Sequence, residues 1–267
     1  MTQDQFKILD NHLGYGSSNP RYIIMGLEEG VAGAGVQNTY EKNQIITQAN
    51  YEHRFLSING QLMDLVDYHL GNPDPNEFAW FGDNAKPQTT WQWYCKLLLG
   101  LEFGYWNNSD LLDYQKTRLG RVTGCNNAII EFLPLPRHDH KAWFTFMNVD
   151  NTNIQSKRSY LDSMLTVNRK SLINEVFDSD NLEVVIVHGS LRGNKLRPYY
   201  NNIIETLNLI YVGDHVLGVK GKKVITNIYG KEYRNKNSKI RVFFTPFLGV
   251  GAMTNEALQN LIKIVRD

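Results

Sequence analysis

The chain has 267 residues, of which 42% are hydrophobic and 21% are charged, and its formal net charge is +1. This length and composition predict a single domain spanning residues 1–267, and the small net charge excludes a polycation, so any nucleic-acid binding must come from a local patch. The sequence has no secretory signal pattern, no apolar run of membrane-spanning length and only two distant cysteines, so we expect a cytoplasmic protein without a membrane partner.

The predicted elements alternate between strands and helices. Short apolar segments bounded by Gly or Pro predict strands, and longer segments with apolar residues three or four apart predict helices. In chain order these are a strand at 22–25, helices at 51–70 and 91–101, a strand at 128–130, a helix at 159–177, a strand at 184–187, a helix at 200–209, a strand at 241–244 and a helix at 255–265. This order predicts an α/β fold, a three-layer α/β/α sandwich with a central four-stranded, mainly parallel sheet.

The first strand runs into a glycine-rich turn that carries two carboxylates. Gly26 and Gly30 flank Glu28 and Glu29, and glycines allow the backbone to turn tightly and approach a ligand closely. The turn has neither the GxGxxG pattern of dinucleotide sites nor the GK[ST] pattern of phosphate loops. A carboxylate here suits a cationic transition state or an activated water. The alternative is a solvated turn in which both carboxylates face water.

The other three strands also end in residues that can take part in chemistry. Glu131 follows the second strand, His188 and Ser190 follow the third, and Thr245 follows the fourth. Ligands of doubly wound sheets bind beyond the carboxyl ends of the strands, so we expect these residues to meet at one site. A carboxylate is costly to bury without a partner, so Glu131 is either a functional group or the structural partner of an arginine such as Arg137.

The four strand ends resemble, in order and spacing, those of the uracil-DNA glycosylase superfamily, nearest its single-strand-selective monofunctional branch. Gly26-Leu27-Glu28-Glu29-Gly30 is similar to the loop that holds the hydrolytic water, and Glu131-Phe132-Leu133-Pro134-Leu135 to the segment whose Asn reads uracil. His188-Gly189-Ser190 is similar to a Trp-Gly-Ser turn. Thr245-Pro246-Phe247-Leu248 is similar to a His-Pro-Ser-Pro-Leu loop that carries an electrophilic His and inserts an apolar wedge into DNA.

The resemblance implies a monofunctional DNA glycosylase with strand order 2-1-3-4, acting without a cofactor or metal. Glu28 or Glu29 would stabilise an oxocarbenium-like sugar and orient water, and Thr245 or His188 would hydrogen-bond the departing carbonyl. The residues expected to contact the flipped base are Gly26, Gly30, Tyr40, Trp91 and Glu131, with Trp93 as a further stacking candidate. The alternative for each aromatic residue is core packing.

Glu131 stands where the family has Asn, and this difference favours a cytosine-type base. An Asn can accept from uracil N3–H and donate to O4, whereas a carboxylate accepts from cytosine N4 and, once protonated, can also donate to N3. Burial of a carboxyl group in an apolar pocket raises its pKa and favours this acid form. Because removal of ordinary cytosine would damage the host genome, we expect a modified cytosine, such as a hydroxymethylated or glucosylated base of phage DNA, and a role in antiviral defence.

Residues 220–241 form a basic segment that holds eight Lys or Arg residues and one acidic residue, Glu232. Such a segment suits contacts with phosphates, and the alternative is a solvated hairpin. The residues expected to contact DNA are Ser190, Lys220, Lys222, Lys223, Arg234, Pro246, Phe247 and Leu248. DNA is the partner we expect, and no obligate protein partner is inferred.

Two other function classes remain open. A non-catalytic sensor of modified bases is favoured by Thr245 in place of the family's His. A hydrolase of small nucleosides would not need the basic segment. The His138-Asp139-His140 run lacks the further ligands that a zinc site needs and predicts a loop.

Overall fold

The computed structural model describes residues 1–27, 37–71, 80–137, 142–162, 167–189, 197–221, 226–236, 239–249 and 251–267. In chain order its elements are α1 (Gln3–Asn11), β1 (Gly14–Gly16), β2 (Tyr22–Gly26), α2 (Tyr40–Ser57), β3 (Leu62–Met63), α3 (Leu65–Leu70), α5 (Thr89–Phe103), α6 (Asp110–Thr117), β4 (Asn127–Glu131), the 3-10 turn η1 (Thr145–Met147), α7 (Lys157–Asp162), α8 (Val167–Phe177), β5 (Val184–His188), α9 (Arg197–Thr206), β6 (Leu209–Lys220), β7 (Thr226–Asn235), β8 (Arg241–Thr245) and α10 (Asn255–Arg266). Within these ranges, none of the helices has both the length and the apolar composition that crossing a membrane requires.

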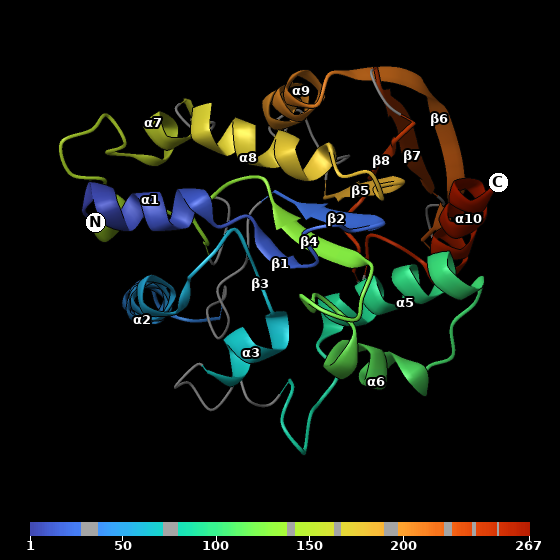
Figure 1. Cartoon of the computed structure of the whole chain (residues 1–267), viewed down its shortest axis with the longest axis horizontal. Helices are drawn as coiled ribbons and strands as arrows, with labels where there is room; N and C mark the ends of the chain where they lie inside the picture. Colours follow the sequence, from blue (N-terminus) through green and yellow to red (C-terminus); the bar gives the residue numbers. More distant parts are fainter. Residues whose placement is uncertain are drawn as a thin grey trace.

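One mixed sheet of eight strands, in the order β3-β1-β4-β2-β5-β8-β7-β6, lies at the centre of the described chain (Figure 1). Strands β4, β2, β5 and β8 are parallel to one another, and they are the four predicted strands in the expected order 2-1-3-4. The predicted sheet of four strands is too small. Strands β1 and β3 extend it beside β4, and the antiparallel β6–β7 hairpin extends it beside β8.

Helices cover both faces of the sheet (Figure 1). Side chains of the parallel strands alternate between two apolar cores; in β2, Ile23 and Met25 face one core, and Tyr22 and Ile24 face the other. The first core includes side chains from α1, α2, α8 and α9, and the second includes side chains from α3, α5, α6 and α10. Because both faces of these strands are buried, their sequences are continuous apolar runs.

The helix predicted at 51–70 is wrong as a single element, because α2 ends at Ser57 and α3 begins at Leu65. Between them β3 pairs with β1, and Asp64 Oδ1 accepts hydrogen bonds from the amides of Val66 and Asp67, both at 3.1 Å. An Asp in this position satisfies amides that the first turn of a helix leaves unbonded, so it starts a new helix.

The remaining predicted helices differ from the structure mainly at their ends. The helices predicted at 91–101 and 255–265 are confirmed as α5 and α10. The segment predicted as one helix at 159–177 includes most of α7 and all of α8, with residues 163–166 outside the described ranges. The helix predicted at 200–209 overlaps α9. However, α9 ends at Thr206, and β6 begins at Leu209.

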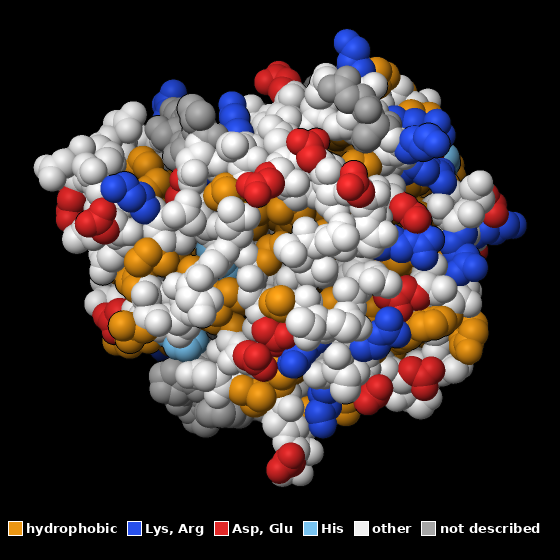
Figure 2. Space-filling view, in the orientation of Figure 1, with side chains coloured by type: hydrophobic (Ala, Val, Ile, Leu, Met, Phe, Trp, Pro, Cys, Tyr) orange, Lys and Arg blue, Asp and Glu red, His pale blue; other side chains and the backbone are white. Residues whose placement is uncertain are grey.

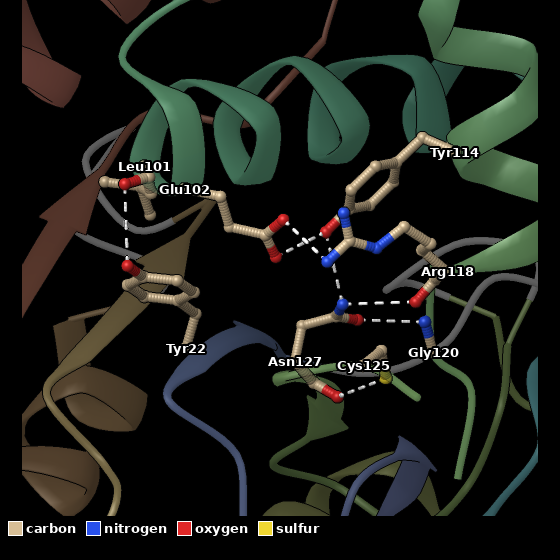
Figure 3. Close-up of polar contacts among 8 residues, drawn as sticks. All are labelled: Tyr22, Leu101, Glu102, Tyr114, Arg118, Gly120, Cys125 and Asn127. Atoms are coloured by element: carbon tan, nitrogen blue, oxygen red, sulfur yellow. Dashed lines mark hydrogen bonds and ion pairs between the residues drawn. The ribbon is translucent and has the colours of Figure 1, made fainter. Parts of the chain in front are cut away.

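At the amino ends of β2 and β4, polar side chains join the sheet to α5 and α6 (Figure 3). Glu102 accepts a hydrogen bond from the Tyr114 hydroxyl at 2.9 Å and forms an ion pair with Arg118 at 3.0 Å. Asn127 accepts from the amide of Gly120 at 2.9 Å and donates to the carbonyl of Arg118 at 3.1 Å. These bonds satisfy buried polar groups and hold the two helices against this edge of the sheet.

Candidate functional site

The carboxyl ends of the four parallel strands bring their last residues into one row. Gly26 of β2 is in register with Glu131 of β4, and His188 of β5 is in register with Thr245 of β8. The pairing of β2 with β5 places Gly26 level with His188, one position after the last paired residues. Because side chains alternate along a strand, the row lies on the face covered by α5, as do the apolar residues two positions earlier in each strand.

The Glu131 carboxylate lies over the Cα atom of Gly26. A Cβ atom added to Gly26 would come within 2.9 Å of Glu131 Oε1 and closer still to Oε2. Glycine at position 26 therefore leaves the space that the carboxylate occupies. The absence of a side chain at this position allows the acidic group of β4 to lie over the neighbouring strand β2.

A buried arginine holds the end of β4 in place. Arg169 of α8 is fully buried and donates to the carbonyl of Phe132 at 2.9 Å and to the carbonyl of Glu131. It also donates to the carbonyls of Asp10 and His12, both at 2.9 Å, at the carboxyl end of α1. Burial lowers the pKa of Arg169 to about 10, an effect that the charges of Asp10 and Glu131 oppose, so the guanidinium stays charged at neutral pH.

Arg137, the alternative structural partner of Glu131, has two described contacts. Arg137 donates to the carbonyl of Ala142 at 3.5 Å, and its guanidinium lies over the ring of Tyr160. The charges of Glu131 and Arg169 act on each other, so Arg169 of α8 is an electrostatic partner of Glu131.

His188 is buried beside two aromatic side chains. Its Nε2 shares a hydrogen bond of 2.8 Å with the hydroxyl of Tyr94 on α5, and its ring lies 5.4 Å from that of Phe247. Burial lowers the pKa of His188 to about 4, so the imidazole is neutral at physiological pH. The other ring nitrogen, Nδ1, is buried and has no hydrogen-bond partner within the part of the chain that the structure describes.

This buried, neutral histidine predicts a loss of stability in acid. An unfolded chain takes up a proton on His188 near pH 6.5, whereas the folded protein does so only near pH 4. The unfolded state therefore binds more protons between these values, and stability falls as the pH falls through this window. Relative to the variant His188→Asn, the wild type should lose about 2–3 kcal/mol of unfolding free energy between pH 8 and pH 4.5, at roughly 1.4 kcal/mol per pH unit. Urea unfolding at several pH values measures this difference. Equal losses in both proteins would contradict it.

The segment after β8 places one apolar side chain at the surface. Thr245 is fully buried, and its hydroxyl donates to the carbonyl of Pro246 at 3.1 Å. Pro246 and Leu248 are buried, whereas Phe247 is 45% exposed. Of the residues predicted to form a wedge, Phe247 therefore presents its ring to solvent, next to His188.

The predicted stacking residues lie in different surroundings. Trp91 is in the first turn of α5, three residues before Tyr94 and so on the same side of the helix. Its ring packs 5.0 Å from those of His69 and Phe81. Tyr40, at the start of α2, is 60% exposed and packs 5.1 Å from the ring of Phe144. Helix α5 thus connects Trp91 with the row, whereas no described contact brings Tyr40 to it.

Several predicted site residues lie outside the described ranges. They are Glu28, Glu29, Gly30, Ser190, Lys222 and Lys223. Among the described basic residues, Lys220 donates to the carbonyl of Gly251 at 3.1 Å, and Arg234 is exposed, 3.9 Å from Glu232. The basic segment runs from the end of β6 through β7 to the start of β8.

Two residues of the site were not predicted from the sequence. From the sequence, Tyr94 was assigned only to the apolar helix at 91–101 and not to the site. The hydroxyl of a buried tyrosine usually has a hydrogen-bond partner, and this could have marked Tyr94 as a candidate. Arg169 had no sequence signal, because a buried arginine on a helix cannot be distinguished from an exposed one without the tertiary contacts. Both act on a strand end from a distant segment.

Within the described ranges, no three His, Cys, Asp or Glu side chains are grouped so that they could hold a metal ion, and His138-Asp139-His140 lies outside those ranges. A scan against protein-family models and searches of curated proteins and solved structures found no match to this chain.

Proposed function

We propose that this protein is a DNA glycosylase that hydrolyses the N-glycosidic bond of a flipped, cytosine-type base, with a modified cytosine as substrate. The observation that carries the proposal is the row at the sheet edge, in which the Glu131 carboxylate lies over Gly26 and the neutral His188 stands on the neighbouring strand β5. A carboxyl group and a neutral imidazole at the carboxyl ends of parallel strands are groups that can bind a base and assist its departure.

Glu131 recognises the base. Its carboxyl group accepts from the N4 amino group of cytosine and, when protonated, donates to N3. Protonation of the ring at N3 makes cytosine a better leaving group, because the departing base is then neutral. The bonds from Arg169 to the carbonyls of Glu131 and Phe132 keep this strand end in place.

His188 assists departure of the base. In the tautomer in which Tyr94 donates to Nε2, the ring proton is on Nδ1, where it can donate to the carbonyl oxygen of the base. Of the two candidates for this role, His188 is favoured over Thr245, whose hydroxyl donates to the carbonyl of Pro246. Glu28 or Glu29 of the turn after β2 stabilises the oxocarbenium-like sugar and orients the attacking water. No metal or organic cofactor enters this scheme.

The arrangement of the sheet supports this function. The parallel centre β4-β2-β5-β8 has the strand order that the resemblance to the uracil-DNA glycosylase superfamily implies, within the three-layer α/β/α arrangement of that family. The exposed ring of Phe247, next to His188, suits the apolar wedge that holds a base out of the helix.

A base-release assay tests the proposal. Matched oligonucleotides that carry one uracil, cytosine, hydroxymethylcytosine or glucosylated hydroxymethylcytosine are incubated with the protein, and alkali-labile abasic sites are counted. We expect abasic sites on a modified cytosine and few on uracil. Release of none of these bases would contradict the proposal.

A second candidate is a sensor that binds modified bases without cutting. Thr245 favours this candidate, because it stands where the family has the electrophilic His. Thr245 is fully buried and its hydroxyl donates to the carbonyl of Pro246, so this residue would have no role in bond breaking. Preferential binding to a modified oligonucleotide, without abasic sites in a single-turnover assay, would support this alternative.

The basic segment predicts a dependence of DNA affinity on salt. Neutralising Lys220, Lys222 and Lys223 together is expected to weaken binding to all DNA sequences alike. Each phosphate contact that is lost should reduce the slope of log K against log salt by about one unit. Binding titrations at several salt concentrations measure this slope, and the triple variant Lys7→Ala, Lys116→Ala, Lys170→Ala, on α1, α6 and α8, serves as the control. If the variant that lacks Lys220, Lys222 and Lys223 keeps the wild-type slope, these lysines make no contact with DNA.

A further inference from the structure

The hairpin of β6 and β7 has two different faces. One face packs toward α10 and carries the paired positions Gly213 with Glu232, His215 with Gly230 and Gly218 with Ile228. The other face carries the pairs Tyr211 with Tyr233, Asp214 with Lys231, Val216 with Tyr229 and Val219 with Asn227. We refer to Tyr211, Asp214, Val216, Val219, Asn227, Tyr229 and Lys231 as the hairpin face.

The aromatic and apolar side chains of the hairpin face are open to solvent. Val216 is 60% exposed, Tyr211 51%, and both Val219 and Tyr229 46%. Contacts with neighbouring side chains nevertheless orient the two tyrosines. The ring of Tyr211 packs 5.5 Å from that of Tyr233, and the hydroxyl of Tyr229 accepts a hydrogen bond from Asn227 at 3.0 Å. Exposed rings that are already oriented lose little conformational freedom when a flat ligand stacks on them.

The charge around the hairpin face is positive. Lys231 lies over the ring of Tyr211 at 5.5 Å and pairs with Asp214 at 3.0 Å. The single acidic residue of the segment 220–241, Glu232, is buried and bonded to Arg241 and His215, both at 2.9 Å. Its charge offsets those of Arg241 and, at 3.9 Å, Arg234, so the positive charge near the hairpin face comes from the other lysines of the segment, such as Lys236 and Lys239. Figure 2 shows Lys and Arg side chains gathered on the side of the molecule where β6, β7 and α10 lie.

The hairpin face extends past the edge of the sheet that carries the candidate site. Lys231 of β7 is in register with Phe244 of β8, the residue before Thr245. Gly230 is therefore level with Thr245, and residues 226–229 of β7 continue beyond the end of β8, by roughly 13 Å at about 3.3 Å per residue. Tyr229 and Val216 lie in this projecting part, next to the strand ends.

We propose that the hairpin face binds a single strand of DNA, with bases stacked on Tyr229 and Tyr211 and phosphates near the surrounding Lys and Arg residues. Every base has a flat π-face that can stack on an aromatic ring, but a duplex covers these faces, so stacking selects single strands. This inference rests on the proposed function for its place in the reaction. The hairpin face and the row lie on opposite faces of the sheet, so the hairpin face would hold nucleotides of the same strand after it passes the end of β8, at a distance from the flipped base.

Fluorescence anisotropy with a labelled oligothymidylate and its duplex with oligoadenylate tests the inference. Tyr229→Ala is expected to weaken binding of the single strand by roughly five- to 150-fold, the range expected for loss of one base–aromatic stack. Tyr229→Phe keeps the ring and should bind as the wild type does. Tyr105→Ala removes a tyrosine that is 63% exposed and lies outside the hairpin, and it should have no effect. None of these variants should change the weaker binding of the duplex.

A second variant covers the case in which Tyr229→Ala fails to fold. Val216→Glu places a carboxylate opposite Tyr229 at a site that is 60% exposed, and it should also weaken single-strand binding. Wild-type affinity in the folded alanine and glutamate variants, equal losses in Tyr229→Ala and Tyr229→Phe, or tighter binding of the duplex by the wild type would each overturn the inference. So would a dimer in sedimentation that Val216→Glu dissociates without any loss of DNA affinity.

The same assay separates this inference from the proposed function. Oligothymidylate contains no cytosine, so its binding does not depend on base release. A protein that binds the single strand through Tyr229 but releases none of the tested bases would contradict the proposed function alone. A protein that releases a modified cytosine but binds single strands equally well without the ring of Tyr229 would contradict the inference alone.

Discussion

Glu131→Asn is expected to slow release of a modified cytosine by roughly tenfold to several hundredfold, because a mismatched buried polar pair costs about 1–3 kcal/mol and more when a charge is involved. Glutamate can accept from N4 and, when protonated, donate to N3. Asparagine can imitate this pattern only by turning its amide, and it cannot act as an acid. In the other amide orientation it matches uracil, so the variant should gain weak activity on that base. Single-turnover rates on the four matched oligonucleotides measure both changes.

A substitution at Gly26 tests the role of the Glu131 carboxylate without changing Glu131 itself. Gly26→Ala adds a Cβ atom where the carboxylate lies, so it should displace that group and reduce release of the modified cytosine while Glu131 itself is unchanged. The control is Glu183→Asn, an exposed glutamate that pairs with Arg21 at the amino edge of the sheet. If the wild type prefers uracil, or if Glu131→Asn keeps full activity on the modified cytosine, then Glu131 does not read the base.

Arg169→Met is expected to lower the free energy of unfolding by about 3–5 kcal/mol, the usual cost of removing one member of a buried charged network. The substitution leaves the buried carbonyls of Phe132, Asp10 and His12 without the guanidinium that now bonds to them. Unpaired buried acceptors retain the cost of desolvation without its compensation. Denaturant unfolding monitored by circular dichroism measures the change.

The neighbouring Lys170 supplies a matched control for this substitution. Lys170 is exposed on the same helix, so Lys170→Met should change the free energy of unfolding by no more than about 0.5 kcal/mol. A change of less than about 1 kcal/mol for Arg169→Met would show that the carbonyls find other partners, and the guanidinium would then not be what holds the end of β4.

The central strands and their order follow from local features of the sequence. β2, β4, β5 and β8 are apolar runs bounded by Gly, Pro or polar residues, and burial on both faces produces this pattern wherever it occurs. Parallel strands end at the same edge, so residues that follow each run could be grouped into one site before any contact was known. The register places Gly26, Glu131, His188 and Thr245 level with one another at that edge.

The outer strands and the break between α2 and α3 needed the tertiary structure. β6 and β7 are exposed on one face and mix apolar, charged and glycine residues, so their sequence does not differ clearly from that of a loop. β3 is only two residues long and exists because it pairs with β1. The start of α3 depends on Asp64, within a stretch whose apolar spacing continues as though one helix ran through it.

What the sequence by itself determined is the α/β alternation, the four parallel strands and the set of residues at their carboxyl ends, because each depends on the burial of short segments. Only the tertiary structure decided which partners those residues have. Tyr94 contacts His188 across 94 positions of the chain, and Arg169 bonds to the carbonyls of Glu131 and Phe132 from α8, 38 and 37 positions away. Hydrogen bonds over such separations depend on how helices pack on the sheet, and no local pattern of residues encodes that packing.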